Sequence, residues 1–329
     1  MKKLTQITSL TLFISGLFGQ GVTTAGLSGS VTDQDGNSLV GADIVAVYTP
    51  TGAQYGASTR SSGAYTILNM KIGGPYKVTV SYIGFKSQSV ENVSLSLGTT
   101  ERMSFQLAQE AIALAGVEVT AEMDDVMNGD RTGAATFISA EQVIQMPSIK
   151  RSTRDLTRLD PRSDGNFSFG GRNWLYNNIS LDGSYFNNPF GLDDPAPGGQ
   201  TNAEPVSFDA VDQVQVSIAP FDVREGGFTG AGINTVTKSG TNTFTATVYS
   251  YNRNESFVGN SVAGNDVVSN PKLSFNQTGV SVGGPIIKDK VFFFANYEME
   301  RRSDPASNFV ADDDGNVKFG ETRVTAADM

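Results

Sequence analysis

Alternation of apolar and polar residues is the main pattern along this chain, and it predicts β-strands. In residues 76–82, aromatic and aliphatic positions alternate with Lys77, Thr79 and Ser81, as in a half-buried strand. Turn-forming residues separate this run from other short ones. The predicted strands are residues 27–32, 42–48, 64–68, 76–82 and 102–107, and the predicted turns are residues 35–37, 62–63 and 73–75. Short strands at this spacing predict a small β-sandwich over residues 26–108.

Longer alternating runs lie in residues 239–329, and their two faces differ in polarity. In residues 291–300, one face turns polar at Asn296, Glu298 and Glu300. The apolar face consists of Val291, Phe293, Ala295, Tyr297 and Met299. Two further predicted strands precede this one, residues 243–251 and 273–282, with a predicted turn at residues 283–290. Strands of about ten residues with an apolar outer face are typical of outer-membrane β-barrels.

These predicted strands are too few to close a barrel, because bacterial barrels need at least about 8 strands. We therefore expect residues 239–329 to be the start of an incomplete barrel, and the chain to be the N-terminal part of a longer protein. The alternative is a complete soluble protein whose last hairpin packs elsewhere. A reading frame that continues past Met329 with more alternating strands would distinguish the two.

Residues 130–238 have a mixed pattern that predicts both helices and strands. Ser139 followed by Gln142 is a capping-box signal for a short helix, and residues 152–159 predict a second one. Two further stretches follow, residues 178–183 and residues 211–216. Glycines at positions 226, 227, 230 and 232 lack the lysine and the spacing of a nucleotide-binding loop, so they predict a structural turn.

Composition narrows the possible functions. The 329 residues contain no Cys and no His, which excludes disulfides, thiol nucleophiles and the commonest general base. A net charge of −10 argues against nucleic acid as a partner. No pair of carboxylates or nucleophile with a base stands out, and Asp193, Asp194 and Glu204 are interpreted as loop charges. We therefore predict that the protein is not an enzyme and has no catalytic, metal-binding or cofactor-binding residues.

The first residues resemble an export signal. Lys2 and Lys3 precede a short apolar stretch at residues 10–18, which predicts a signal peptide over residues 1–19. A membrane anchor is the alternative, although the stretch is shorter than the roughly 20 residues that span a bilayer. Two acidic clusters, one at Asp33, Asp35 and Asn37 and one at residues 312–316, do not fit the EF-hand spacing. They are interpreted as a plain turn and a solvated loop.

Two ordered sets of residues resemble known families. Residues 27–33, 41–44, 63–67 and 76–85 look like the carboxypeptidase-regulatory-like domain, whose fold is a transthyretin-like β-sandwich without a catalytic role. Residues 181–183 (Leu-Asp-Gly), 214–216 (Val-Gln-Val) and 233–238 then follow in the order found in the plug of TonB-dependent outer-membrane receptors. Residues 219–223 depart from the commoner plug pattern. Together with residues 283–286 and 292–294, they indicate the Oar-like subgroup.

The resemblance implies a fold class and a set of partners. The fold would be mainly β: a transthyretin-like β-sandwich, an α+β plug domain and the first strands of an incomplete transmembrane β-barrel. The implied domains are residues 26–108, a linker at 109–129, a plug at 130–238 and the start of the barrel at 239–329. The implied location is the outer membrane of a Gram-negative bacterium, with the N-terminal domains on the periplasmic side.

The linker carries the candidate site. Val117, Glu118, Val119, Thr120 and Ala121 resemble the TonB box, which recruits the periplasmic domain of TonB; a mere linker strand is the alternative. The resemblance implies TonB-energised uptake of a large ligand that the sequence does not identify, with outer-membrane lipid around the full barrel and no cofactor. The alternative function is an exported adhesion or carbohydrate-binding β-sandwich protein.

Overall fold

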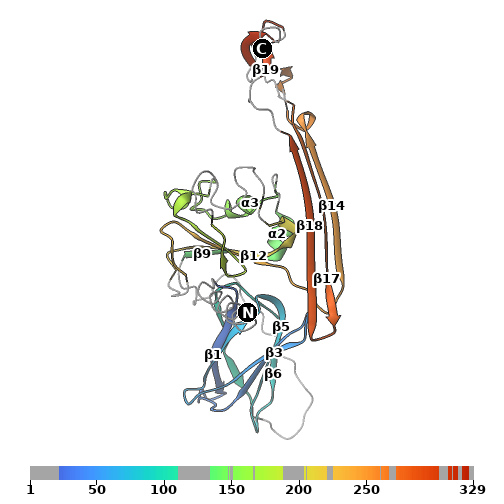
Figure 1. The fold of residues 1–329 in the computed structure, drawn as a ribbon. Coiled ribbons are helices and arrows are strands. Elements are labelled where there is room, and N and C mark those ends of the chain that lie inside the picture. The colour runs from blue at the N-terminus through green and yellow to red at the C-terminus, as the bar shows by residue number, and fades with distance from the viewer. Residues whose placement is uncertain are drawn as a thin grey trace, which may run out of the picture. The chain divides into compact units, whose positions relative to one another are not determined.

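The computed structural model describes residues 22–109, 134–146, 148, 151–165, 167–187, 204, 206–220, 225–259, 261–266, 272–303, 310–312, 314–317 and 321–325. Figure 1 shows its strands and helices as a ribbon. The chain divides into two compact units: the first comprises residues 1–244 and 283–294, and the second comprises residues 245–282 and 295–329. Within the described residues, no helix has both the length and the apolar character needed to cross a bilayer.

Two sheets form a β-sandwich at the start of the first unit. One has the order β4 (Ala64–Met70), β1 (Ala25–Asp33), β7 (Thr100–Arg102), with β8 (Phe105–Leu107) also paired to β1. The other has the order β3 (Ala53–Ser58), β2 (Asp43–Tyr48), β5 (Gly73–Ser81), β6 (Gln88–Leu95). β1 pairs antiparallel with β4 but parallel with β7 and β8, so the end of the sandwich returns beside its first strand.

The sandwich core follows from alternation along these strands. Ile44, Ala46, Val78 and Val80 have no exposed surface; they are cross-strand neighbours on β2 and β5 and share one buried cluster with Leu27 of the other sheet. This confirms the predicted sandwich. The predicted turn at residues 73–75 is wrong because β5 already begins at Gly73, and strands β3 and β6 were not predicted. The predicted strand at residues 102–107 is divided into β7 and β8.

A five-stranded sheet with two short helices forms the rest of the first unit's core. Its order is β11 (Ser184–Tyr185), β10 (Asn178–Leu181), β13 (Gly232–Thr237), β12 (Val211–Ile218), β9 (Ala134–Ile138). β10 and β13 are parallel, whereas β12 is antiparallel to both β13 and β9. Short 3-10 turns occur as η1 (Trp174–Tyr176) and η3 (Phe208–Ala210). The stretches at residues 178–183 and 211–216 therefore supply two strands of this sheet, β10 and β12.

The two helices pack on one face of this sheet. α2 (Ala140–Gln145) begins after Ser139, whose side chain caps the helix in a capping box with Gln142, as predicted. α3 (Thr153–Thr157) begins after Ser152, which accepts a hydrogen bond from the Asp155 amide. Val143 and Leu156 of the helices join a buried cluster with Val214, Val216 and Ile233 of the sheet. The cluster makes this α+β domain a unit with its own core.

Three long strands follow in the order β14 (Thr245–Asn254), β17 (Ser274–Ile287), β18 (Val291–Ser303). β17 continues through the predicted turn at residues 283–287, so that part of the prediction is wrong; the turn lies at residues 288–290 instead. Gly284 lets the strand pass close to Phe244, because a Cβ atom there would lie 2.4 Å from the Phe244 ring. In β18 the predicted apolar face is the exposed one, with Tyr297 66% exposed and Met299 42% exposed.

Smaller elements complete the second unit. They are η4 (Glu255–Phe257), β15 (Ser261–Val262), β16 (Asn265–Asp266), β19 (Val310–Asp312) and β20 (Glu321–Thr325). β15 pairs antiparallel with β16, and β19 pairs parallel with β20. The described fold is therefore mainly β, as predicted.

Candidate functional site

The predicted TonB-contacting segment lies outside the described residues. Its flanks are β8, which ends the sandwich at Leu107, and β9, which opens the α+β sheet. The predicted signal peptide at residues 1–19 also lies outside them. The described candidate residues lie in the motifs of the α+β domain and on the surfaces around them.

The Leu-Asp-Gly motif forms the turn that joins β10 to β11. Asp182 and Gly183 both adopt positive φ values, 47° and 81°, so the chain reverses here. The Asp182 carboxylate accepts hydrogen bonds from the Thr237 amide and the Thr237 hydroxyl, each at 2.8 Å. Asp182 therefore ties the end of β13 to the turn, and its role in the described structure is architectural rather than catalytic.

The glycine-rich turn before β13 fits around Asn177. The Asn177 side chain accepts a hydrogen bond from the Ala231 amide at 2.9 Å and donates one to the Phe167 carbonyl. A Cβ atom on Gly230 would lie 2.3 Å from the Asn177 side-chain oxygen, so only glycine fits. The glycines thus permit close packing of backbone against a buried amide, which agrees with the structural turn predicted from the sequence.

The face of the α+β sheet opposite the helices is polar yet buried. Gln213, Gln215 and Ser217 alternate along β12 and are 7%, 5% and 3% exposed. Asn234 on the neighbouring β13 donates hydrogen bonds to Gln215 and to Glu225, both at 3.0 Å. Ser180 on β10 donates to Asn234 at 2.5 Å. This chain of side-chain hydrogen bonds satisfies polar groups that burial would otherwise leave without partners.

The β-sandwich covers part of this polar face. The Leu97 amide donates a buried hydrogen bond to the Gln213 side-chain oxygen at 3.1 Å. Lys71 hydrogen-bonds Ser239 and is attracted to Asp212 on β12. Burial raises the pKa of Asp212, and Lys71 and Lys238 partly oppose that rise. Burial lowers the pKa of Lys71, and the charge of Asp212 partly opposes that decrease.

A groove of about 900 Å³ lies beside this contact. Asn92, Ser94 and Glu101 of the sandwich line it, together with Ser139 and Gln142 at the start of α2. Sites for small organic ligands are mostly apolar, with only a few polar groups. Tyr48, Pro75 and Phe137 also line the groove, but hydroxyl, amide and carboxylate groups are the more numerous, which favours a wet crevice.

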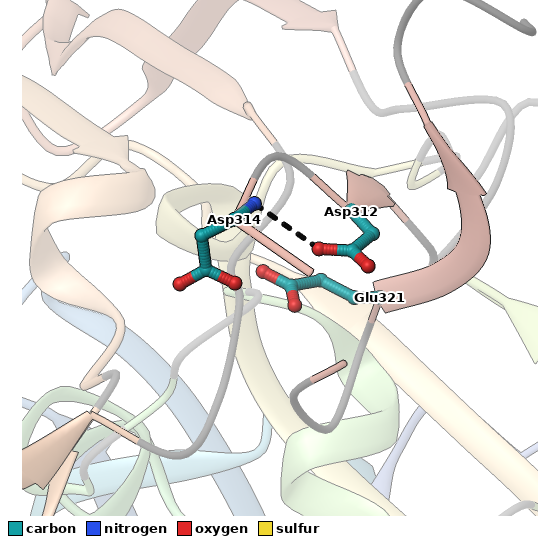
Figure 2. Close-up of side chains that lie close together, drawn as sticks. All are labelled: Asp312, Asp314 and Glu321. Atoms are coloured by element: carbon teal, nitrogen blue, oxygen red, sulfur yellow. Dashed lines mark hydrogen bonds between the residues drawn. The ribbon is translucent and has the colours of Figure 1, made fainter. Parts of the chain in front are cut away.

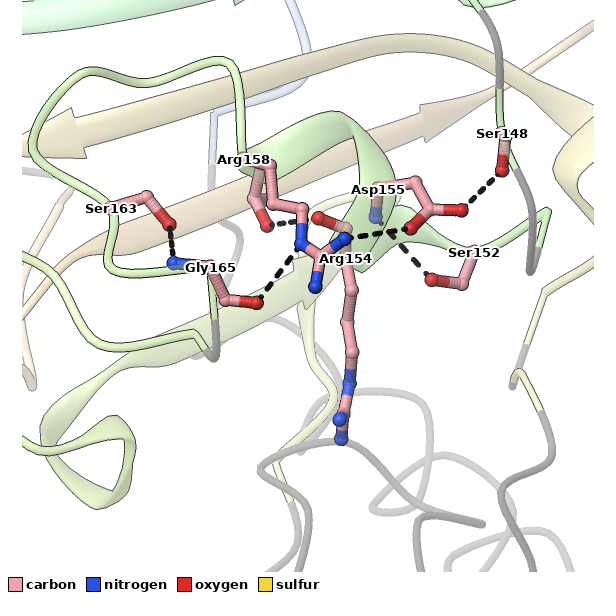
Figure 3. A network of polar contacts seen from close by, with 8 residues as sticks. Ser148, Ser152, Arg154, Asp155, Arg158, Ser163 and Gly165 are labelled. Atoms are coloured by element: carbon pink, nitrogen blue, oxygen red, sulfur yellow. Dashed lines mark hydrogen bonds and ion pairs between the residues drawn. The ribbon is translucent and has the colours of Figure 1, made fainter. Parts of the chain in front are cut away.

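A polar network holds α3 in place (Figure 3). Asp155 accepts a hydrogen bond from Ser148 at 2.5 Å, and Arg158 lies 3.9 Å from the other Asp155 oxygen. The Arg158 guanidinium also donates to the Gly165 carbonyl at 3.2 Å. Glu204, interpreted from the sequence as a loop charge, accepts hydrogen bonds from the Thr153 amide and hydroxyl, each at 3.3 Å. Burial raises the pKa of Glu204.

Three carboxylates meet where β19 and β20 pair (Figure 2). Oxygens of Asp312, Asp314 and Glu321 all lie within 4.8 Å of one another, and Asp312 and Glu321 are each 8% exposed. The interpretation of this stretch as a solvated loop is therefore wrong for Asp312, which ends a strand and accepts amide hydrogen bonds from Asp314 and Gly315. In contrast, Asp33 accepts amide hydrogen bonds from Asp35 and Asn37, as a plain turn requires.

Two known protein families match parts of this chain. The family described as carboxypeptidase regulatory-like domain matches residues 26–108, which is the sandwich. The family described as outer membrane beta barrel domain matches residues 236–313, which include the three long strands. The chain is also 26% identical to the TonB-dependent transporter Oar of Myxococcus xanthus, over 96% of this chain and 30% of that protein. The resemblance to Oar-like TonB-dependent receptors is confirmed. The location in the outer membrane is confirmed with it.

Solved structures show weaker likenesses. The siderophore receptor PirA from Pseudomonas aeruginosa is 17% identical with a TM-score of 0.37, covering 51% of this chain and 27% of the receptor. A mutant catechol 1,2-dioxygenase from Acinetobacter radioresistens is 15% identical with a TM-score of 0.23, covering 31% of this chain and 57% of the enzyme. At these TM-scores neither likeness supports a statement about ligand or activity.

Proposed function

We propose that this chain forms the periplasmic entrance of a TonB-dependent outer-membrane transporter. The observation that supports the proposal is the order of its parts. A carboxypeptidase-regulatory-like sandwich precedes an α+β domain, and long strands with an apolar exposed face follow. The similarity to Oar covers 96% of this chain and 30% of Oar. The proposed boundaries are residues 26–108 for the sandwich, 109–129 for the linker, 130–238 for the plug and 239–329 for the start of the barrel.

The α+β domain would act as the plug. Its helices and sheet enclose an apolar core of their own, so the domain can fill a barrel without borrowing apolar surface from the barrel wall. The proposed role is to occlude the barrel until energy arrives from the inner membrane. The N-terminal domains would then lie on the periplasmic side.

Val117, Glu118, Val119, Thr120 and Ala121 are the proposed contact for the periplasmic domain of TonB. An extended segment with alternating side chains can add to the edge of a partner's sheet through its backbone N–H and C=O groups. The proposal includes no enzyme activity and no cofactor. The ligand is proposed only as a large molecule that needs energised uptake.

Binding to TonB tests the proposal. The full-length chain is titrated with the C-terminal domain of TonB in a calorimeter, first unchanged and then with Val119→Pro. Proline removes the backbone donor and prevents strand pairing, so we expect at least tenfold weaker binding, about 1.4 kcal/mol. Met127→Pro, in the same linker but outside the segment, is the matched control and should bind as the parent does. Absence of binding by the parent would refute TonB coupling through this segment.

A further inference from the structure

The contact between the sandwich and the α+β domain differs in kind from the interior of either domain. Each domain has a buried apolar cluster, and the two clusters are separate. The contact between them is built mainly from amides, hydroxyls and charges, with Val236 as a partly buried apolar residue that packs against the sandwich core. Separating two apolar surfaces costs about 25 cal/mol for each Å² of apolar surface exposed to water. In contrast, when amides and hydroxyls separate, water can take the place of their protein hydrogen-bond partners at little cost.

The turn at residues 96–99 provides the fitted part of the contact. The Leu97 amide donates to Gln213, and this bond is buried. Gly98 has a φ of 72°, and a Cβ atom there would lie 2.9 Å from the Gln215 side-chain nitrogen. The backbone of the turn therefore lies directly against two adjacent glutamines of β12. This close fit specifies one docked position for the sandwich.

Lys71 provides the charged part. Its ammonium group lies 5.2 Å from the centre of the Tyr48 ring within the sandwich and hydrogen-bonds Ser239 beyond β13. Asp212 on β12 is the acidic partner that attracts it, and Lys238, which pairs with Asp209 at 3.9 Å, is the other cation near Asp212. Opposite charges near each other across a contact favour the docked state, and reversing the sign of one of them opposes it.

We propose that the sandwich is a detachable clamp on the polar face of the plug sheet, held by the 96–99 turn on Gln213 and Gln215 and by the hydrogen bond from Lys71 to Ser239. In the docked state it covers the amide ladder of that face. In the released state the ladder faces water, and both apolar cores stay intact. The clamp therefore provides two states of the periplasmic entrance without unfolding either domain.

Distance measurement between two spin labels tests the clamp. The chain has no Cys, so Gln54→Cys in the sandwich and Leu175→Cys in the plug domain give one labelled pair in the full-length chain. We expect one narrow distance for the parent and a broad distribution for Lys71→Glu, which places like charges together. Adding Asp212→Lys should restore the narrow distance. Lys77→Glu breaks an exposed ion pair with Glu91 on the same domain and should leave the distance narrow.

A second variant separates release from misfolding. Gln213→Ala removes the acceptor of the Leu97 amide from the plug side and leaves the sandwich sequence unchanged, so it should broaden the distance as Lys71→Glu does. Hydrogen exchange of β2 and β5 should stay slow in both variants, because the sandwich core is intact. A broad distance in the parent, or a narrow one in both variants, would overturn the clamp.

Discussion

Replacing Asp160 with asparagine should weaken the plug domain more than any comparable surface change. The Asp160 side chain is completely buried, and Arg162 donates to it from its backbone amide at 2.9 Å and from Nε at 2.8 Å. Thr136 donates to its other oxygen at 2.9 Å, so one carboxylate joins β9 to the turn after α3. Asparagine has the same shape as aspartate but no charge. Its NH₂ group replaces one carboxylate oxygen, so a donor would face the donor groups of Arg162 or Thr136.

The magnitude follows from these contacts. Removing one partner from a buried ion pair costs about 3–5 kcal/mol. The Arg162 side chain is 27% exposed and can be hydrated in the variant, so we expect a loss just below that range, about 2–3 kcal/mol. Against a typical domain stability of 5–15 kcal/mol, such a loss is large.

Tryptophan fluorescence provides the assay. Trp174 is the only Trp in the chain and packs against the buried cluster of the α+β domain, so its emission during denaturant titration follows that domain. Asp164→Asn is the matched control. Asp164 is exposed and four residues away, and the Asn side-chain oxygen can still accept the hydrogen bond from the Ser168 amide, so stability should change by less than about 0.5 kcal/mol. A loss below 0.5 kcal/mol for Asp160→Asn would refute the assigned role.

The same pair predicts an acid dependence. Burial alone would raise the pKa of Asp160, but hydrogen bonds from Arg162 and Thr136 outweigh it and hold the pKa below its usual value of 3.8. A carboxyl with a lowered pKa in the folded state stabilises the fold above its unfolded pKa and loses that contribution as pH falls through the folded value. The parent should therefore lose stability below about pH 4 more steeply than Asp160→Asn does.

Three further substitutions test other contacts. Tyr65→Phe removes the buried hydroxyl that donates to the Met103 carbonyl at 2.5 Å and should cost the sandwich about 1–2 kcal/mol, measured by hydrogen exchange of β1 and β4. Gly29→Ala would place a Cβ atom 1.8 Å from that same carbonyl and should abolish protection of β1, whereas Gly36→Ala, at a turn with a φ of 84° but open space, should strain only that turn and keep β1 protected. Gly279→Ala would place a Cβ atom 2.3 Å from the Tyr249 ring and should reduce outer-membrane assembly; recovery with Tyr249→Ala added would confirm the collision, and unchanged assembly of the single variant would contradict it.

Local signals in the sequence were enough to predict much of this fold. Ser139 and Gln142 predicted the start of α2 because a capping box depends only on residues three apart. Alternation predicted which face of β18 is exposed because it also depends only on nearby residues, here two positions apart. In contrast, β3 was not predicted, because Ala, Gly and Ser in residues 53–58 have low strand propensity, and pairing with β2 decides their conformation.

Long-range burial could not be predicted in the same way. Gln213 and Gln215 alternate with valines, and a two-residue period assigns them to a solvent-exposed face. That face is instead buried by a turn 116 residues earlier in the chain at the Leu97 contact. Asp312 was misassigned for a related reason, since its burial depends on the pairing of β19 with β20 and not on its acidic neighbours.

The two faces of the plug sheet therefore have different uses. The apolar face meets α2 and α3 and gives the domain its stability, whereas the polar face has its hydrogen bonds completed partly by another domain. The proposed release of the sandwich requires a face that can exchange protein partners for water without losing its core. The amide ladder on β12 and β13 fits that requirement because its groups bond to one another as well as to the sandwich. A polar contact of this kind favours reversible docking, whereas an apolar contact would cost about 25 cal/mol for each Å² exposed on release.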